Sequence, residues 1–328
     1  MSGRKENENK MKDKLEWKLT NYPSYLKSFY YSMADKSYTT KNAYINNIIH
    51  FLDFVDYEFN IDTNDVDELN KIKPSNINIY ISSMDNLSNG TKAGRLYAIK
   101  SFFDFLVNDE HVKSNPVAKV KIPKDNEEHK ITFLTKKEIG IIKKNIEKGV
   151  GSPRARAKSA QFKKRDYAII MLALSLGLRV TSLTEINISD IDFDKNEIKI
   201  VVKGNKIRRV KFSDNIKTVL NDWLFDRRFI MGDYLSNTDA LFVSERKVRI
   251  SAHTVAEIVK KYTYNIDKRI TPHKLRSTCA TNVYNATGDI YLTADILGHA
   301  NIANTRRYAQ ISDERKEKAA SAMDKILF

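Results

Sequence analysis

The sequence predicts a mainly α-helical protein of two domains, with a small β-sheet in the second domain. The chain of 328 residues is longer than most single domains, and its 41% hydrophobic content suffices for two cores. Apolar residues recur at helical spacing along most of the chain, whereas an alternating pattern typical of strands follows Asp190. A proline-containing stretch without periodicity separates the two helical regions and predicts an interdomain linker.

The domain boundaries follow from changes in this pattern. Residues 1–21 are highly charged with few apolar positions, and they predict a flexible leader or a weak helix. Residues 22–117 predict a domain of four or five helices. The stretch 114–130 carries two prolines and mixed charge, and residues 118–130 of it are the predicted extended linker. Residues 131–328 then form the second domain.

Two apolar stripes mark helices of the first domain. Their members are Tyr44, Ile48, Phe51, Leu52 and Val55 in one helix, and Leu96, Ile99, Phe103 and Leu106 in the other. Thr39 or Thr40 can cap the first of these helices. Pro74 suits the first turn of a further helix that extends to about Ser83.

The second domain begins with a helix after Thr135 and contains one hairpin. The segment 151–165 holds six basic residues and no acidic one, which is typical of a phosphate-contacting or a disordered segment. The apolar run 166–178 predicts a fully buried helix. Residues 197–212 form two β-branched runs around Gly204-Asn205, which is a strong hairpin signal.

From His253 onward the sequence is helical again. Gly288 and Gly298 predict breaks between helices, and residues 313–327 predict a final amphipathic helix.

The formal net charge of +15 is concentrated in the second domain. Residues 1–130 hold 19 Lys/Arg against 19 Asp/Glu, whereas residues 131–328 hold 37 against 22. A basic surface releases counterions from a polyanion and speeds its encounter, so nucleic acid is the natural partner. The alternative is a basic solvated surface that keeps the protein soluble.

Several protein classes are excluded by what the sequence lacks. Cys279 is the only cysteine, so one chain cannot build a disulfide framework or a thiolate metal cluster. No apolar run reaches the length of about 18 to 20 residues that a membrane helix needs, and the first twenty residues lack a signal peptide's apolar stretch. The sequence has no GxxxxGK[ST] phosphate cradle and no carboxylate metal motif. We therefore expect a soluble cytoplasmic protein, associated with the nucleoid, that uses no cofactor or metal.

A phosphate site is predicted at the start of one helix. Thr271 and Pro272 suit the cap and the first turn, which places His273 and Arg276 three residues apart on one face. An imidazole and a permanent cation beside a helix amino end favour an anion. A pair of this kind by itself is more often ordinary surface chemistry of a helix.

Further positions are candidates for binding or reacting with the same phosphate. Arg179 follows the apolar run, and its guanidinium needs either a carboxylate or a bound phosphate. Lys203 lies at the hairpin tip, where a lysine is either solvated or a mobile proton donor. Tyr308 comes nine residues after His299 of Leu297-Gly298-His299. A tyrosine becomes a useful nucleophile only among cations, because its ordinary pKa is about 10.

These elements, in this order, resemble the catalytic set of the tyrosine recombinases of the lambda-integrase and Xer-like group. The matching positions are Gly177-Leu178-Arg179, Lys203, His273, Arg276, Leu297-Gly298-His299 and Tyr308. The resemblance covers roughly residues 25–320, and includes 39–55 and 88–106 as helices of the core-binding domain. It implies a SAM-like helical core-binding domain and a mixed α/β catalytic domain that close around duplex DNA as a clamp.

The resemblance also implies a mechanism. Tyr308 attacks the scissile phosphate and leaves a 3′-phosphotyrosyl link, and the free 5′-hydroxyl later attacks the partner strand. Arg179 and Arg276 hold the nonbridging oxygens in place of a metal. Integration, excision, inversion and resolution of DNA all use this chemistry.

The other site residues have implied roles in proton transfer and phosphate binding. Lys203 protonates the leaving 5′-oxygen, His273 acts as a general acid or base, and His299 donates a hydrogen bond to the phosphate. The family usually has an acidic residue three positions after the first arginine, where this chain has Ser182. Glu185, three residues further along the same helix, is a candidate replacement.

The expected partner is a double-stranded DNA recombination site. The candidate DNA contacts are Lys41, Lys92, Arg95, Lys100, Arg154, Arg156, Lys158, Lys163 and Lys164, and the alternative for the first four is the polar face of an amphipathic helix. By resemblance, the protein acts as a homotetramer on two sites and exchanges its final helix, residues 313–328, between neighbours. Accessory DNA-bending proteins are further candidate partners, and no membrane is expected.

Three other functions are less consistent with the sequence. A type IB topoisomerase shares the chemistry but relaxes DNA without exchanging partners, and the helical first domain argues against it. A noncatalytic DNA-binding regulator on the same fold would not need every catalytic residue type. A metal-dependent nuclease would need the carboxylate motif that the sequence lacks, and EDTA-resistant cleavage would exclude it.

Overall fold

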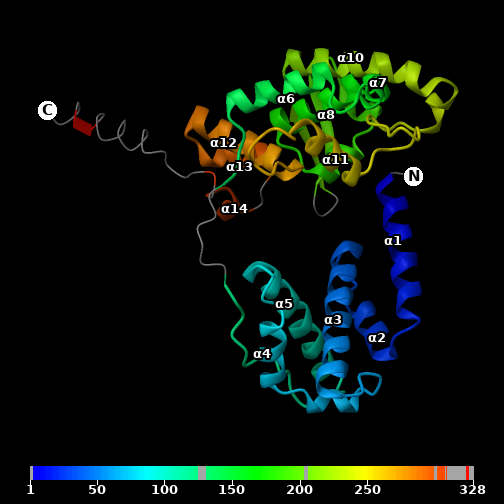
Figure 1. Ribbon diagram of the computed structural model, residues 1–328, viewed down its shortest axis with the longest axis vertical. Coiled ribbons are helices and arrows are strands. Elements are labelled where there is room, and N and C mark those ends of the chain that lie inside the picture. Colours follow the sequence, from blue (N-terminus) through cyan, green and yellow to red (C-terminus); the bar gives the residue numbers. More distant parts are fainter. Residues whose placement is uncertain are drawn as a thin grey trace. The chain divides into compact units, whose positions relative to one another are not determined.

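The protein is mainly helical with one small sheet, as the sequence predicts. The computed structural model describes residues 3–124, 131–202, 206–298, 301–306, 308 and 323–324. The chain divides into two compact units, Met1–Glu128 and His129–Phe328, and each has its own hydrophobic core (Figure 1). Within the described residues, no helix is long and apolar enough to cross a membrane.

The first unit is a helical bundle with an aromatic core. Its helices are α1 (Gly3–Leu19), α2 (Ser24–Ser32), α3 (Tyr38–Phe59), α4 (Pro74–Ser82), α5 (Asn89–Asn108) and the short 3-10 helix η1 (Asp67–Lys71). The two stripes predicted from the sequence meet, because α3 packs along α5. Phe51 of α3 and Phe103 of α5 are fully buried, with ring centroids 6.3 Å apart in an edge-to-face arrangement.

The ends of these helices show where local sequence signals were right and where they were wrong. Pro74 occupies the first turn of α4, as predicted. The cap of α3 is Ser37, whose hydroxyl accepts from the Thr40 backbone N–H at 3.3 Å, and neither Thr39 nor Thr40 fills that position. The error arose because three of the four residues 37–40 are Ser or Thr, and each of them is a suitable cap.

Residues near both ends of the chain segment that forms the first unit contribute to its core. The segment 1–21, predicted to be a flexible leader or a weak helix, forms α1, and its Leu15 and Leu19 are buried. At the other end, Val117 is buried and Val120 packs against the same core. The first residues of the predicted linker are therefore attached to this unit, and residues 125–130 lie outside the described part of the chain.

The second unit contains the sheet and the remaining helices. The helices are α6 (Lys136–Lys148), α7 (Pro153–Ala160), α8 (Lys163–Leu176), α9 (Val180–Glu185), α10 (Asp214–Met231), α11 (Ala252–Tyr262), α12 (Pro272–Thr287), α13 (Ile290–Leu297) and α14 (Ala303–Arg306), with the 3-10 helices η2 (Ile188–Asp190) and η3 (Gly232–Asn237). The antiparallel sheet has the order β1 (Ile191–Asp192), β2 (Glu197–Val202), β3 (Lys206–Lys211).

Helix α8 is the buried helix that the apolar run predicts. It packs against α6, α10, α11 and α12 and lies inside the second unit (Figure 1). Thr135 caps α6 through a reciprocal hydrogen-bond pair with Glu138, as expected for a helix starting there. Gly288 and Gly298 end α12 and α13 in the left-handed conformation, so the predicted breaks are confirmed.

Two features of the second unit add to or narrow the predictions, and two predicted elements lie partly or largely outside the described residues. The basic segment 151–165 is not disordered, because helix α7 covers more than half of it. Ser152 caps this helix. The strand β1 was not predicted, since two residues are too few to show alternation. The predicted hairpin forms, with Val202 paired to Lys206, and its loop residues 203–205 lie outside the described residues. The predicted final helix 313–327 also falls outside them, apart from two residues.

Candidate active site

The predicted phosphate site begins where α12 begins. Thr271 occupies the cap position and Pro272 the first turn, although the Thr271 side chain makes no capping hydrogen bond. The side chain of His273 is exposed, whereas Arg276 is only 4% exposed. Arg276 is thus the inner member of the pair and His273 the outer one.

Arg276 is fixed by backbone carbonyls from two other helices. Its Nη1 donates to the Gly177 carbonyl and its Nη2 to the Leu297 carbonyl, both at 2.6 Å. These carbonyls lie at the carboxyl ends of α8 and α13, where unpaired carbonyls carry the negative end of the helix dipole. The two bonds use two of the five guanidinium N–H donors. The arrangement orients the guanidinium without neutralising its charge.

Gly177 allows α8 and α13 to approach each other at this point. Its φ of +58° is left-handed, and an added Cβ would lie 2.8 Å from Leu297 Cδ2 and 3.1 Å from Cys279 Sγ. A side chain at this position would therefore be strained and would collide with the side chains of Leu297 and Cys279. The glycine of Gly177-Leu178-Arg179 has a packing role as well as a conformational one.

Positive charge accumulates around Arg276. Burial, together with neighbouring Arg179 and Arg208, lowers the pKa of Arg276 to about 10, while Tyr308 and Cys279 act in the opposite direction. Arg276 still carries its charge at neutral pH. Arg179 follows the cap of α8 and is exposed. The structure therefore brings the two predicted arginines and Tyr308 within electrostatic range of one another.

Tyr308 packs against the helices that carry the other site residues. It is 5% exposed and forms a small cluster with Ala280 of α12 and Leu297 of α13. Its backbone N–H donates to the Thr305 carbonyl at 2.8 Å. The sequence pattern gave no sign of this burial, because Tyr308 lies in a polar stretch of the chain.

Two predicted catalytic residues, Lys203 and His299, lie outside the described residues. Their attachment points are described. Lys203 follows Val202 at the end of β2, and His299 follows Gly298 at the end of α13.

The position of the usual acidic residue has a different environment in this chain. The Ser182 hydroxyl donates to the Val201 carbonyl at 3.1 Å and so joins α9 to β2. Glu185 acts electrostatically on Arg249, whose guanidinium is bonded to the Thr184 carbonyl at 2.9 Å. Ser182 therefore supports the hairpin strand directly, through a hydrogen bond and without a charge.

Arg208 belongs to the same region and was missed by the sequence reasoning. Its Nη1 donates to the Ile296 carbonyl at 3.0 Å, and its Nη2 lies 3.6 Å from Asp295 Oδ2. The available sequence signal is strand alternation, which puts Arg208 on the same face as Val210, and the structure shows these two residues less exposed than their neighbours in β3.

The candidate DNA contacts of the first unit differ in how available they are. Lys41 is 8% exposed, and its ammonium lies 4.7 Å and 5.6 Å from the centroids of two tyrosine rings. Lys92 lies 3.7 Å from Asp85, and Arg95 contacts a histidine of α3 at 3.4 Å. Lys100 is exposed. Lys41 is consequently the least available of the four for a phosphate.

The basic segment presents some of its charge to solvent. Arg154 and Arg156 are exposed, although Arg156 Nε also donates to a backbone carbonyl at 2.8 Å. Lys163 is half-buried, and Lys164 lies 3.0 Å from a carboxylate of α10. The side chain of Lys158 lies outside the described part.

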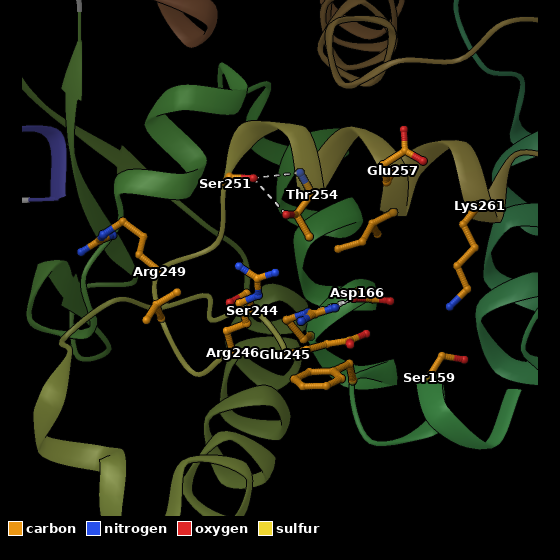
Figure 2. Close-up of a pocket in the computed structure, with 14 residues that line it drawn as sticks. Ser159, Asp166, Ser244, Glu245, Arg246, Arg249, Ser251, Thr254, Glu257 and Lys261 are labelled. Atoms are coloured by element: carbon orange, nitrogen blue, oxygen red, sulfur yellow. Dashed lines mark hydrogen bonds and ion pairs between the residues drawn. The ribbon is translucent and has the colours of Figure 1, made fainter. Parts of the chain in front are cut away.

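A cavity of about 680 Å³ opens elsewhere in the second unit, and no predicted catalytic residue lines it (Figure 2). Arg165 and Asp166 lie in its wall, with two guanidinium donors on Asp166 Oδ1 at 2.9 Å and 2.7 Å. Tyr262 donates to Asp166 Oδ2 at 3.0 Å, and burial together with Asp166 raises the pKa of this phenol. This network is a closed internal ion pair. Among the described residues, no group of three or more His, Cys, Asp or Glu could hold a metal ion.

Comparisons with known proteins find relatives along most of the chain. Residues 132–315 match the phage integrase family. The chain is 31% identical over 323 residues to tyrosine recombinase XerC of Caldanaerobacter subterraneus subsp. tengcongensis, which covers 92% of this chain and 86% of that protein.

Solved structures share the fold. A post-cleavage complex of the XerH site-specific recombinase with a palindromic difH substrate superposes with a TM-score of 0.70 at 20% identity, over 88% of this chain and 81% of that one. A lambda integrase dimer bound to a COC′ core site gives a TM-score of 0.64 at 18% identity, over 87% and 94%.

Proposed function

Because this chain belongs to the phage integrase family and is a tyrosine recombinase that acts on DNA, we propose that Tyr308 is its nucleophile. The Tyr308 hydroxyl attacks the scissile phosphate, the P–O bond to the 5′-oxygen breaks, and a 3′-phosphotyrosyl link remains. The observation that carries this assignment is the clustering of Tyr308 with α12 and α13 beside the buried Arg276. The 5′-hydroxyl of the partner strand then reverses the step, so that bond energy is conserved without ATP.

The arginines supply the electrostatic part of the catalysis. Arg276 is oriented by two carbonyls and keeps its charge, so it is organised to stabilise nonbridging oxygens as negative charge develops. Arg179 is exposed next to it and completes the pair. Such preorganised guanidinium groups serve where a metal ion would otherwise act.

The remaining catalytic roles rest on the family resemblance. Lys203, at the tip of the hairpin, protonates the leaving 5′-oxygen. His273 is exposed on the first turn of α12, and in this proposal it contacts DNA and acts as a general acid or base. His299, which follows α13, donates a hydrogen bond to the phosphate.

We also propose a DNA recombination site as the substrate and an assembly of four subunits on two such sites. The support is the shared fold with XerH on difH and with the lambda integrase dimer on its core site. In this proposal the two units close on duplex DNA as a clamp, and residues 313–328 pass between neighbouring subunits. Residues 22–117, 118–130 and 131–328 are the core-binding domain, linker and catalytic domain.

A nicked suicide substrate tests the proposal. The nick lies next to the cleavage point, so the short released strand diffuses away and a covalent intermediate accumulates. With native flanking DNA, the wild type should give a protein–DNA adduct that survives denaturation, and Tyr308→Phe should give none. Phenylalanine keeps the ring that packs on Ala280 and Leu297, so the variant loses only the hydroxyl. Absence of an adduct with the wild type, or its persistence in Tyr308→Phe, would contradict the mechanism.

A further inference from the structure

Arg208 of β3 has no part in the mechanism above, yet its guanidinium lies at the end of α13. Nη1 donates to the Ile296 carbonyl at 3.0 Å, and Nη2 lies 3.6 Å from the exposed Asp295 carboxylate. The two partners are more than eighty residues away in the sequence. The contact therefore joins the hairpin to α13 through tertiary structure.

Two arginines bind successive carbonyls at this helix end. Arg208 takes the Ile296 carbonyl, and Arg276 takes the Leu297 carbonyl. The last carbonyls of a helix have no partner inside the helix and attract cations. Bringing a second guanidinium close to Arg276 has an electrostatic cost, since Arg208 contributes to the lowered pKa of Arg276. The hydrogen bonds offset this repulsion and keep both groups in place.

Gly298 leaves room for Arg208. Its φ is +63°, and an added Cβ would lie 2.8 Å from Arg208 Nη1. A side chain at this position would be strained and would displace the guanidinium. The glycine that ends α13, immediately before His299, is thus matched to an arginine of the hairpin.

We propose that Arg208 is a positioning residue, whose bond to the Ile296 carbonyl holds β3, and through it β2, against the end of α13. The inference rests on the proposed function, in which Lys203 protonates the leaving oxygen. Arg208 lies two residues from Lys206, where β3 begins, about 7 Å along the strand, and its partner on β2 is Ile200. Lys203 follows Val202, the last residue of β2, so holding these strands affects the proton transfer that the proposed function assigns to Lys203.

The alternative is that Arg208 binds the scissile phosphate itself. Both of its terminal nitrogens are already directed at α13, one at a carbonyl and one at a carboxylate. The positioning role accounts for these contacts without moving the side chain.

A substrate with a bridging sulfur at the leaving 5′-position separates the two roles. A thiol ionises with a pKa of about 8.5, so a sulfur leaving group needs no proton donor. General acid catalysis contributes about 10²- to 10⁴-fold, and a misplaced donor retains part of it. We expect Arg208→Ala to cleave the oxygen substrate about 10- to 100-fold more slowly than the wild type, and the sulfur substrate at nearly the wild-type rate.

Three controls complete the experiment. Lys203→Ala should show the same pattern with a larger loss on oxygen, and Tyr308→Phe should be inactive on both substrates. Arg209→Ala is the matched control. Arg209 is the next residue along β3, and its own side chain is 66% exposed and pairs with Glu197 at 3.7 Å on the sheet surface. It should resemble the wild type on both. Arg208→Lys keeps the charge but not the planar fork, so a smaller loss on oxygen is expected even if Arg208→Ala folds poorly.

The outcomes distinguish this inference from the function on which it rests. If Lys203→Ala recovers on sulfur but Arg208→Ala and Arg208→Lys do not, the positioning role is wrong and direct phosphate binding is favoured. Wild-type activity of Arg208→Ala on oxygen would also overturn it. If Lys203→Ala itself fails to recover, the role of Lys203 is wrong, and the inference fails with it. If the wild type forms no adduct, the proposed function fails.

Discussion

Two buried arginines of the second unit are held in different ways. Arg165 is 4% exposed and is neutralised by the adjacent Asp166, with a further bond from Nη1 to the Val243 carbonyl at 2.9 Å. Arg276 is equally buried, but the described part of the chain offers it two carbonyls and places no carboxylate within 4.0 Å. Its charged neighbours, Arg179 and Arg208, repel it.

The difference supports the proposal that Arg276 is a functional arginine, whereas Arg165 is a structural one. A buried ion pair satisfies both charges internally and has little to offer a ligand. A guanidinium held by dipoles keeps its charge for an anion that arrives later, and the surrounding cations raise its preference for that anion. The phosphate of the scissile bond is the missing counter-charge in this account.

The largest expected effect comes from removing the functional arginine. Arg276→Ala should lower the rate of adduct formation on the suicide substrate by about 10³-fold, because the developing charge on the phosphate loses an oriented donor. DNA binding, measured by mobility shift, should change far less, since many basic residues share it. Cleavage within tenfold of the wild type by a folded Arg276→Ala would remove the distinction between the two arginines.

The structural arginine should show the opposite behaviour. Asp166→Ala leaves Arg165 buried without its counter-charge, and the free energy of unfolding should fall by about 3 to 5 kcal/mol in urea titrations. The matched control is Asp226→Ala, which removes a surface partner of Lys164 at 3.0 Å and should cost less than about 1 kcal/mol. Equal losses of unfolding free energy in the two variants would mean that burial does not determine how much each ion pair stabilises the fold.

A partly buried ion pair, Lys268 with Glu138, is the third case and has the smallest expected effect. Burial acts to raise the pKa of Glu138, but hydrogen bonds from Lys268 and Thr135 outweigh it, and the net pKa is lowered. A depressed carboxyl pKa stabilises the fold above the unfolded value of about 4.3, and this contribution is lost as the pH falls through the folded pKa.

Glu138→Gln tests this third case. The variant should lower the unfolding free energy slightly at pH 6, and its difference from the wild type should disappear in strongly acidic solution. A difference in unfolding free energy that grows as the pH falls would contradict the lowered pKa of Glu138.

The sequence predicted the elements of this site better than their contacts. Apolar periodicity and the capping, proline and glycine signals located α8, the start of α12 and the hairpin, because these signals are local. The carbonyls that hold Arg276 lie 99 and 21 residues away, and the Ile296 carbonyl lies 88 residues from Arg208. No local pattern encodes such pairings, since they depend on how α8, α12 and α13 pack.

The same limit applies to two candidate side chains whose surroundings the sequence does not show. Glu185 was a candidate replacement for the absent acid, yet the turn of α9 brings it into the field of Arg249. Lys41 was a candidate DNA contact, yet it packs over tyrosine rings of the first unit. In both cases the residue type was read correctly, but its environment depended on elements distant in the sequence.

The central claim is that Tyr308 becomes covalently attached to DNA. Its most direct test is mass spectrometry of the trapped adduct after nuclease trimming and tryptic digestion. The account predicts a nucleotide remnant on the peptide 308–315, attached to Tyr308. A remnant on any other residue would contradict it.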